Sequence, residues 1–125
     1  MTQSPIYDQT VTIDCGDANV LATFYSKLLG WKKYDHPEWP CVGPEGDHPR
    51  ILFQKIEDYI PPVWPEEPGK MRQMMHFDFA VRDLEEGGKH AIACGATLSP
   101  RQYSDRWTVY FDPEGHPFCL IVIDE

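Results

Sequence analysis

The chain has 125 residues, a length typical of one domain, and 42% of them are hydrophobic, which is enough to form a core. Its 20 acidic residues outnumber 11 basic ones, and the formal net charge of −9 at pH 7 argues against nucleic acid or an anionic membrane as partner, because both are recognised by basic surfaces. Because the N-terminal residues show no basic segment followed by an apolar run, we expect no signal peptide. No apolar stretch approaches the ~18 residues that a spanning helix needs, so we expect no such helix. Its four cysteines form no C-x-x-C motif, so we expect a cytoplasmic protein with reduced thiols.

The first predicted element is a strand over residues 11–15 (VTIDC), where apolar and polar residues alternate. Asp17 is a typical helix N-cap, and Gly30 stands where a helix end often requires a positive φ. We therefore expect a helix between them. Its apolar stripe would consist of Val20, Leu21, Phe24, Tyr25 and Leu28.

The same order of elements returns in the second half of the chain. HFDFAV (76–81) is the second strand, Asp83 the second N-cap and Gly95 the second helix end. Each helix is followed by a Trp, a Pro-Glu-Gly tripeptide and an apolar strand: Trp39, 44–46 and 51–54 in the first half, and Trp107, 113–115 and 118–123 in the second. This internal repeat predicts two modules, at about 8–56 and 74–125, each with a strand, a helix and about three further strands.

Between the modules lies a proline-rich stretch, residues 57–73, which begins EDYIPPVWPEEPGK. Proline removes a backbone donor, so this stretch is neither a central strand nor a helix. We interpret it as an extended connector inside a single domain that spans residues 1–125. Lys70 and Arg72 could hold an anionic group of a substrate or neutralise the acidic connector, and we favour the second reading.

Three stretches together resemble the vicinal oxygen chelate superfamily of glyoxalases, bleomycin-resistance proteins and extradiol dioxygenases: VTIDCGDANVLATFYSKLLGW (11–31), HFDFAVRDLEEGGKHAIACGAT (76–97) and DPEGHPFCLIV (112–122). Within it the chain looks most like the glyoxalase-like branch, whose second module opens with a His-x-Asp strand and ends Asp-Pro-Glu-Gly-x-x-Phe-Cys. The resemblance implies an α+β fold in which two βαβββ modules form a curved, cup-shaped, eight-stranded mixed sheet. The helices would lie outside and the ligand inside.

Metal-dependent members of the superfamily bind an ion through four matching positions, most of them His, Glu or Gln. Here the resemblance places Thr10, Phe53 or Gln54, His76 and Cys119 at these positions. Cys119 could bind zinc as a thiolate, but hard ions would reject it, which leaves His76 as the one confident ligand type. We therefore expect no metal and no cofactor; any divalent ion would involve His76.

The alternation in HFDFAV puts Phe77 and Phe79 on an apolar face and His76 and Asp78 on the opposite face. In the implied cup, that opposite face would line the ligand site. An imidazole is a natural proton carrier near neutral pH, so His76, oriented by Asp78, is the candidate catalytic pair. The alternative is that both are half-buried polar residues without a chemical role.

Six further residues are candidate substrate contacts: Thr12, Asp14, Gln54, Trp107, Cys119 and Trp39. The repeat puts Thr12 and Asp14 on the cup side of the first strand. The two tryptophans could wall an apolar cup or belong to the core. Nothing in FCLIV (118–122) would stabilise a thiolate, so Cys119 is interpreted as a lining residue rather than a nucleophile. The remaining histidines are interpreted as surface residues: His36, His48, His90 and His116.

Three functions fit these observations. The first is a small-molecule-binding glyoxalase-like protein that could act as a metal-independent isomerase or lyase through His76 and Asp78. The second is a bleomycin-resistance-like protein that sequesters a small molecule without catalysis, for which an acidic protein and a cationic drug are a sensible match. The third, a metal-dependent lyase or dioxygenase, lacks ligands. We also expect a homodimer, because the connector carries Tyr59, Ile60, Val63 and Trp64 among its prolines.

Overall fold

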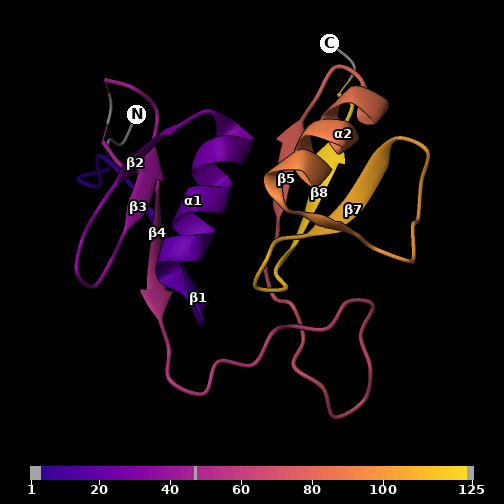
Figure 1. The fold of residues 1–125 in the computed structure, drawn as a ribbon, viewed down its shortest axis with the longest axis horizontal. Helices are drawn as coiled ribbons and strands as arrows, with labels where there is room; N and C mark the ends of the chain where they lie inside the picture. The colour runs from indigo at the N-terminus through magenta and orange to yellow at the C-terminus, as the bar shows by residue number, and fades with distance from the viewer. Residues whose placement is uncertain (1–3, 47, 124–125) are drawn as a thin grey trace.

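The computed structural model describes residues 4–46 and 48–123 and contains two modules with the same order of elements (Figure 1). The first comprises β1 (Val11–Cys15), α1 (Ala18–Leu29), β2 (Lys32–Tyr34), β3 (Cys41–Gly43) and β4 (Ile51–Lys55). The second comprises β5 (Phe77–Ala80), α2 (Leu84–Cys94), β6 (Thr97–Leu98), β7 (Trp107–Phe111) and β8 (Pro117–Ile121). The predicted α+β fold of two βαβββ modules is confirmed.

The eight strands are divided between two four-stranded mixed sheets, with the orders β1-β4-β3-β2 and β5-β8-β7-β6. In each sheet the first strand of the module pairs in parallel with the last, and the other pairings are antiparallel. The register fixes which residues share a face, because paired residues point to the same side. Asp14 pairs with Gln54, and Asp78 pairs with Cys119.

Both helices begin and end where the sequence predicts. The Asp17 carboxylate accepts the backbone N–H of Val20 at 3.1 Å, and Asp83 accepts that of Glu85 at 2.9 Å. Gly30 and Gly95 follow the last turns with φ of 69° and 116°, a region that favours glycine because a Cβ is strained there. These local signals are sufficient to set where α1 and α2 begin and end along the chain.

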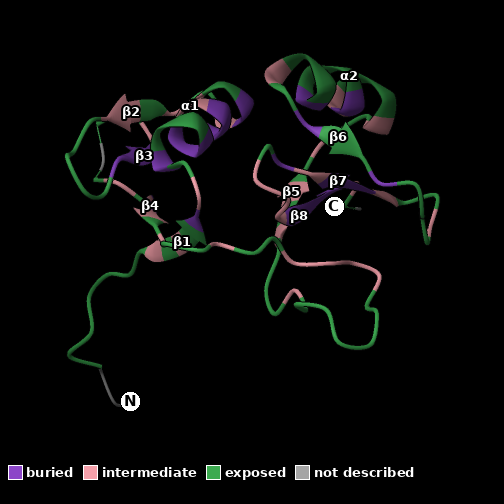
Figure 2. Cartoon of the chain, turned by 60° about the horizontal axis from the view of Figure 1, so that its bottom comes forward, coloured by how far each residue is buried: buried purple, intermediate pink, exposed green. Residues whose placement is uncertain are grey.

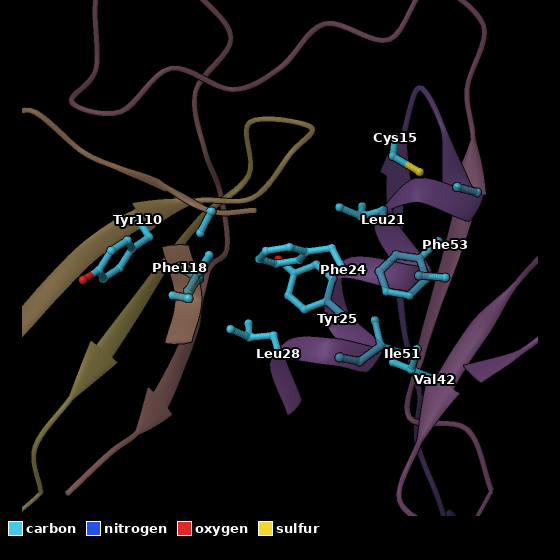
Figure 3. Close-up of a cluster of buried hydrophobic side chains, with 14 of the residues drawn as sticks. Cys15, Leu21, Phe24, Tyr25, Leu28, Val42, Ile51, Phe53, Tyr110 and Phe118 are labelled. Atoms are coloured by element: carbon cyan, nitrogen blue, oxygen red, sulfur yellow. The ribbon is translucent and has the colours of Figure 1, made fainter. Parts of the chain in front are cut away.

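The core lies around α1, which packs against both sheets (Figures 1 and 3). The Tyr25 ring stacks on Phe53 of β4 at 5.6 Å between ring centroids and meets Phe77 of β5 edge-on at 5.9 Å. Phe24 contacts Phe118 of β8 at 6.0 Å. The apolar faces of the two sheets therefore share one core. The opposite face of each sheet, which we call its polar face, lies on the side away from that core.

The connector between β4 and β5 runs outside the two modules and is mostly exposed or half-buried (Figure 2). Among the described residues, its backbone forms a single isolated β-bridge, between Val63 and Arg72. This confirms that it is neither a helix nor a strand of a sheet. The Arg72 guanidinium lies 3.4 Å from the carboxylate of Glu66, which favours the interpretation that its charge neutralises the acidic connector.

No helix in the described part of the chain is long and apolar enough to cross a membrane.

Candidate functional site

The predicted catalytic pair lies at the start of β5. The Nε2 atom of His76 is 3.3 Å from an Oδ1 atom of Asp78, and the two side chains are 30% and 56% exposed. Cys119 of the neighbouring β8 points to the same face, and one ligand-type atom from each of the three residues lies within 4.8 Å of the others. The alternation of the strand therefore brings an imidazole, a carboxylate and a thiol together on the polar face of the second sheet.

The thiol of this cluster is protonated at neutral pH. Burial, followed by the charge and a hydrogen bond of Asp78, raises the pKa of Cys119 to about 11. A thiolate is the reactive form of cysteine. Cys119 is therefore a buried neutral thiol and not a nucleophile, as the sequence analysis expected, but it lines none of the cavities described below.

The four positions that hold the ion in metal-dependent members do not make a comparable donor set in this chain. Phe53 is fully buried in the core, so the first module offers the hydroxyl of exposed Thr10 and the amide of Gln54. In the second module, His76 and Cys119 approach each other and are the two good ligand types of the set. A catalytic metal site needs about three good protein ligands, and the residues at these four positions do not fit one.

A cavity of about 560 Å³ opens between β1, the start of β5 and the connector. Thr12, Asp14 and His76 all line it, so the structure brings together three predicted site residues from different modules. The wall also includes apolar residues, namely Val11, Ile13, Ile60, Met71, Met74 and Phe77. A volume in this range and a wall that is largely apolar but also offers polar and charged groups are typical of a small-molecule site.

The other predicted contacts lie elsewhere. Gln54 shares the polar face of the first sheet with Asp14 but is not part of the cavity wall. Trp107 is on the same face as Asp78 and Cys119, two residues along β7 from Val109, which pairs with Cys119. Trp39 stacks on the His36 ring at 5.2 Å, in the loop between β2 and β3. These three side chains therefore do not line the 560 Å³ cavity together with His76.

A second His–Asp pair lies where the modules and the connector meet, and the interpretation of His116 as a surface residue was wrong. His116 is half-buried, and its Nδ1 atom is 2.9 Å from the Asp112 carboxylate. Its Nε2 atom is 2.7 Å from the backbone carbonyl oxygen of Asp14 and 3.0 Å from the Tyr59 hydroxyl. The imidazole therefore links β1, the connector and the turn before β8.

Asp112 is the centre of this junction, which we define as Tyr25, Tyr59, Asp112, Glu114 and His116. Its fully buried carboxylate accepts the Tyr25 hydroxyl at 2.7 Å and the backbone N–H groups of Glu114 and His116 at 2.9 and 3.0 Å. The Glu114 carboxylate in turn accepts the N–H groups of Gly16 and Asp17 at the start of α1, where the helix dipole favours a negative charge. Tyr25, Tyr59 and His116 also line the 560 Å³ cavity.

The protonated form of His116 fits its surroundings. Burial on its own lowers the pKa of the imidazole, but the hydrogen bond and charge of Asp112, the Asp14 carbonyl and Glu114 outweigh burial and leave the pKa raised. Both ring nitrogens face acceptor oxygens. The protonated imidazole has two N–H groups and can donate to both oxygens, whereas the neutral ring can donate to only one. The Asp-Pro-Glu-Gly-His turn was the feature of the sequence that could have indicated this role of His116. The partners of the imidazole, Asp14 and Tyr59, are far away along the chain.

The fold and the site define a glyoxalase-like protein, and the family comparison agrees. The family model described as Glyoxalase-like domain matches residues 10–121, so the chain belongs to this family. No curated protein matches the sequence.

Several solved structures share the fold at low sequence identity. The fosfomycin resistance protein FosX from Listeria monocytogenes is 13% identical with a TM-score of 0.67, over 100% of this chain and 94% of that one. TnmS3, an antibiotic binding protein from a Streptomyces species, is 14% identical with a TM-score of 0.61, over 98% and 100%. A glyoxalase/bleomycin resistance protein/dioxygenase family enzyme from Burkholderia phytofirmans is 18% identical with a TM-score of 0.65, over 92% and 98%.

Proposed function

We propose that the protein binds a small organic molecule in the cavity between β1 and the start of β5. The observation that carries the proposal is that Thr12, Asp14 and His76, from both modules, line one largely apolar cavity of about 560 Å³. Structural neighbours that are named as antibiotic-binding or resistance proteins are consistent with such a role. Binding comes first in the proposal because the cavity supports it without any assumption about a reaction.

The charges around the cavity favour a ligand with an apolar body and a positive charge. Asp14 and Asp58 line the wall. The two cationic groups of the wall already have partners, because the Arg72 guanidinium is paired with Glu66 and the His116 imidazole with the buried Asp112 carboxylate. The rings of Tyr25, Tyr59 and Phe77 also line it, and aromatic faces attract quaternary ammonium groups. The net charge of −9 adds a general attraction for cations.

A matched pair of probes tests this proposal. We expect hexyltrimethylammonium to bind more tightly than hexanesulfonate in calorimetric titrations at low ionic strength. Asp14→Asn should weaken binding of the ammonium about fivefold, which corresponds to ~1 kcal/mol. Asp105→Asn, which removes an exposed carboxylate outside the cavity, should leave it unchanged. Equal binding of both probes, or equal effects of the two variants, would contradict the proposal.

Proton transfer by His76 is the second candidate function. Because Nε2 faces the Asp78 carboxylate, the neutral ring carries its proton on Nε2 and leaves Nδ1 as the acceptor. Such a ring can remove a proton from a bound molecule and return it, as an isomerase or lyase requires. Gln54 and Trp107, two of the predicted substrate contacts, lie outside the cavity, so we do not expect them to hydrogen-bond a molecule bound there. Exchange of ligand protons with deuterated solvent, lost in both His76→Ala and Asp78→Asn, would separate catalysis from binding alone.

We further propose that the protein is a homodimer that needs no metal. Ile60, Met71, Met74 and Met75 of the connector are 51% to 92% exposed, and apolar side chains at that density usually mark a contact. A second copy would also cover the polar faces that lie away from the core. Sedimentation that gives the monomer mass of 14.4 kDa at micromolar concentration would exclude the dimer.

Elemental analysis tests the proposal that the site needs no metal. Near one equivalent of zinc, iron or nickel, lost in His76→Ala, would exclude a metal-free site.

A further inference from the structure

The connector places one aromatic side chain directly over the candidate catalytic histidine. The Trp64 ring stacks on the imidazole of His76, with 5.3 Å between ring centroids and 28° between planes. The same Trp64 ring stacks on Tyr103, at 5.7 Å and 19°. Trp64 therefore covers ring faces that belong to the second module, one at the start of β5 and one in the loop before β7.

Few interactions other than this stacking hold the described part of the connector in place around Trp64. The neighbouring Val63 donates its N–H to the Met71 carbonyl at 2.7 Å in the isolated β-bridge. The ion pair of Glu66 and Arg72 is largely exposed, and exposed ion pairs contribute little to stability. The position of the indole therefore depends largely on the two rings that it covers.

We propose that His76 and Tyr103 form a binding platform for a planar aromatic group, and that Trp64 is an occupant which such a ligand replaces. Neither Trp64 nor Tyr103 lines the 560 Å³ cavity, so the platform is a second place for a ligand. The platform deepens the proposed function because His76 belongs to both the platform and the cavity. The inference rests on the proposed function only in so far as His76 is a ligand-binding residue.

The indole of Trp64 indicates the chemistry that the platform accepts. It is flat and apolar on its faces, and it stacks on both rings. A planar aromatic ligand could make the same offset-stacked contacts. Each ring also has a charged neighbour, because the Asp78 carboxylate contacts His76 and the Arg101 guanidinium lies over the Tyr103 ring, 5.6 Å from its centre. A non-planar ligand of equal size could not stack on both rings.

Removal of the indole side chain provides a direct test with free indole as the probe. In calorimetric titrations, we expect Trp64→Ala to bind indole about tenfold more tightly than the wild-type protein, because no side chain has to be displaced. Cyclooctanol, which is similarly apolar but not planar, should show no such gain. Tyr103→Ala in the Trp64→Ala background should abolish the gain, whereas exposed Tyr7→Ala should not.

Equal indole affinities of wild type and Trp64→Ala would overturn the proposal, and so would an equal gain for cyclooctanol or a gain that survives Tyr103→Ala. Trp64→Phe, which keeps a ring on the platform, serves as the folded control and should bind indole as the wild type does. The wild-type protein gives an independent measurement when labelled with 5-fluorotryptophan. The fluorine resonance of Trp64 is assigned by its loss in Trp64→Phe. At high indole concentration this resonance should shift, while those of Trp31 and Trp39 stay in place. A Trp64 resonance that does not move would contradict displacement.

The same variants separate this inference from the proposed function. Asp14→Asn should weaken binding of hexyltrimethylammonium in the cavity and leave indole binding to Trp64→Ala unchanged. Binding of indole as expected without binding of the ammonium would refute the cavity and keep the platform. The reverse result would refute the platform and keep the cavity.

Discussion

The protein contains two His–Asp pairs that differ in how far their hydrogen-bonding groups are already used. His76 and Asp78 are separated by 3.3 Å and lie at the surface of the second sheet, with the carboxylate 56% exposed. His116 and Asp112 are 2.9 Å apart, and the Asp112 side chain is completely buried. Asp112 accepts hydrogen bonds from Tyr25, from His116 and from two backbone N–H groups.

The contrast separates a pair that is available for a ligand from a pair that holds the structure. A buried carboxylate without its partners is very costly, so the partners of Asp112 are required for folding. Asp78 is partly solvated, and His76 keeps Nδ1 for another molecule. The same two residue types therefore serve opposite purposes, and burial and the number of partners decide which.

The largest effect is expected from removal of the buried carboxylate. Asp112→Ala should lower the free energy of unfolding by about 3–5 kcal/mol, because it leaves the Tyr25 hydroxyl and the His116 imidazole without their acceptor. Asp78→Ala, the matched change in the exposed pair, should change it by ~0.5 kcal/mol or less. Urea denaturation of both variants measures the difference. Similar losses would show that the two pairs do not differ as the burial indicates.

The two faces of β5 should give the next largest difference. Phe77 is half-buried against the core and contacts the Tyr25 ring, so Phe77→Ala should cost about 2–3 kcal/mol. His76→Ala should cost less than about 1 kcal/mol and should abolish ligand binding instead. If the two variants were equally unstable in urea, His76 would be a structural residue and the candidate site would be wrong.

A smaller effect concerns pH. The pKa of His116 is raised in the folded protein, so the stability it provides is complete below the pKa of an unfolded histidine. That contribution is lost as the pH rises through the folded pKa. We expect stability to fall from mildly acidic to alkaline pH, because the neutral imidazole can donate only one of the two hydrogen bonds that the charged ring makes. His116→Gln should flatten this dependence, whereas His76→Gln should leave it in place; melting curves across the pH range measure both.

The sequence was sufficient for the features that depend on near neighbours. Strand alternation placed His76 and Asp78 on one face, and Asp17 and Gly30 marked the ends of α1, because these signals act within a few residues. His116 was misread because its partners in β1 and the connector are 102 and 57 residues away. In the same way, nothing local predicted that Trp64 covers His76, or that α1 packs against both sheets. These contacts depend on how the modules are placed.

The turn that carries Asp112 has a counterpart in the first module, and the two are not interchangeable. Pro113-Glu114-Gly115 corresponds to Pro44-Glu45-Gly46, and the residue that corresponds to Asp112 is Gly43. A Cβ at Gly43 would come within 2.7 Å of the His48 carbonyl oxygen and 2.8 Å of Pro49 Cα. An engineer who copied only the carboxylate into the first module, as Gly43→Asp, would therefore put a side chain into a turn that has no room for it. The duplicated architecture tolerates this asymmetry because a single junction serves both halves.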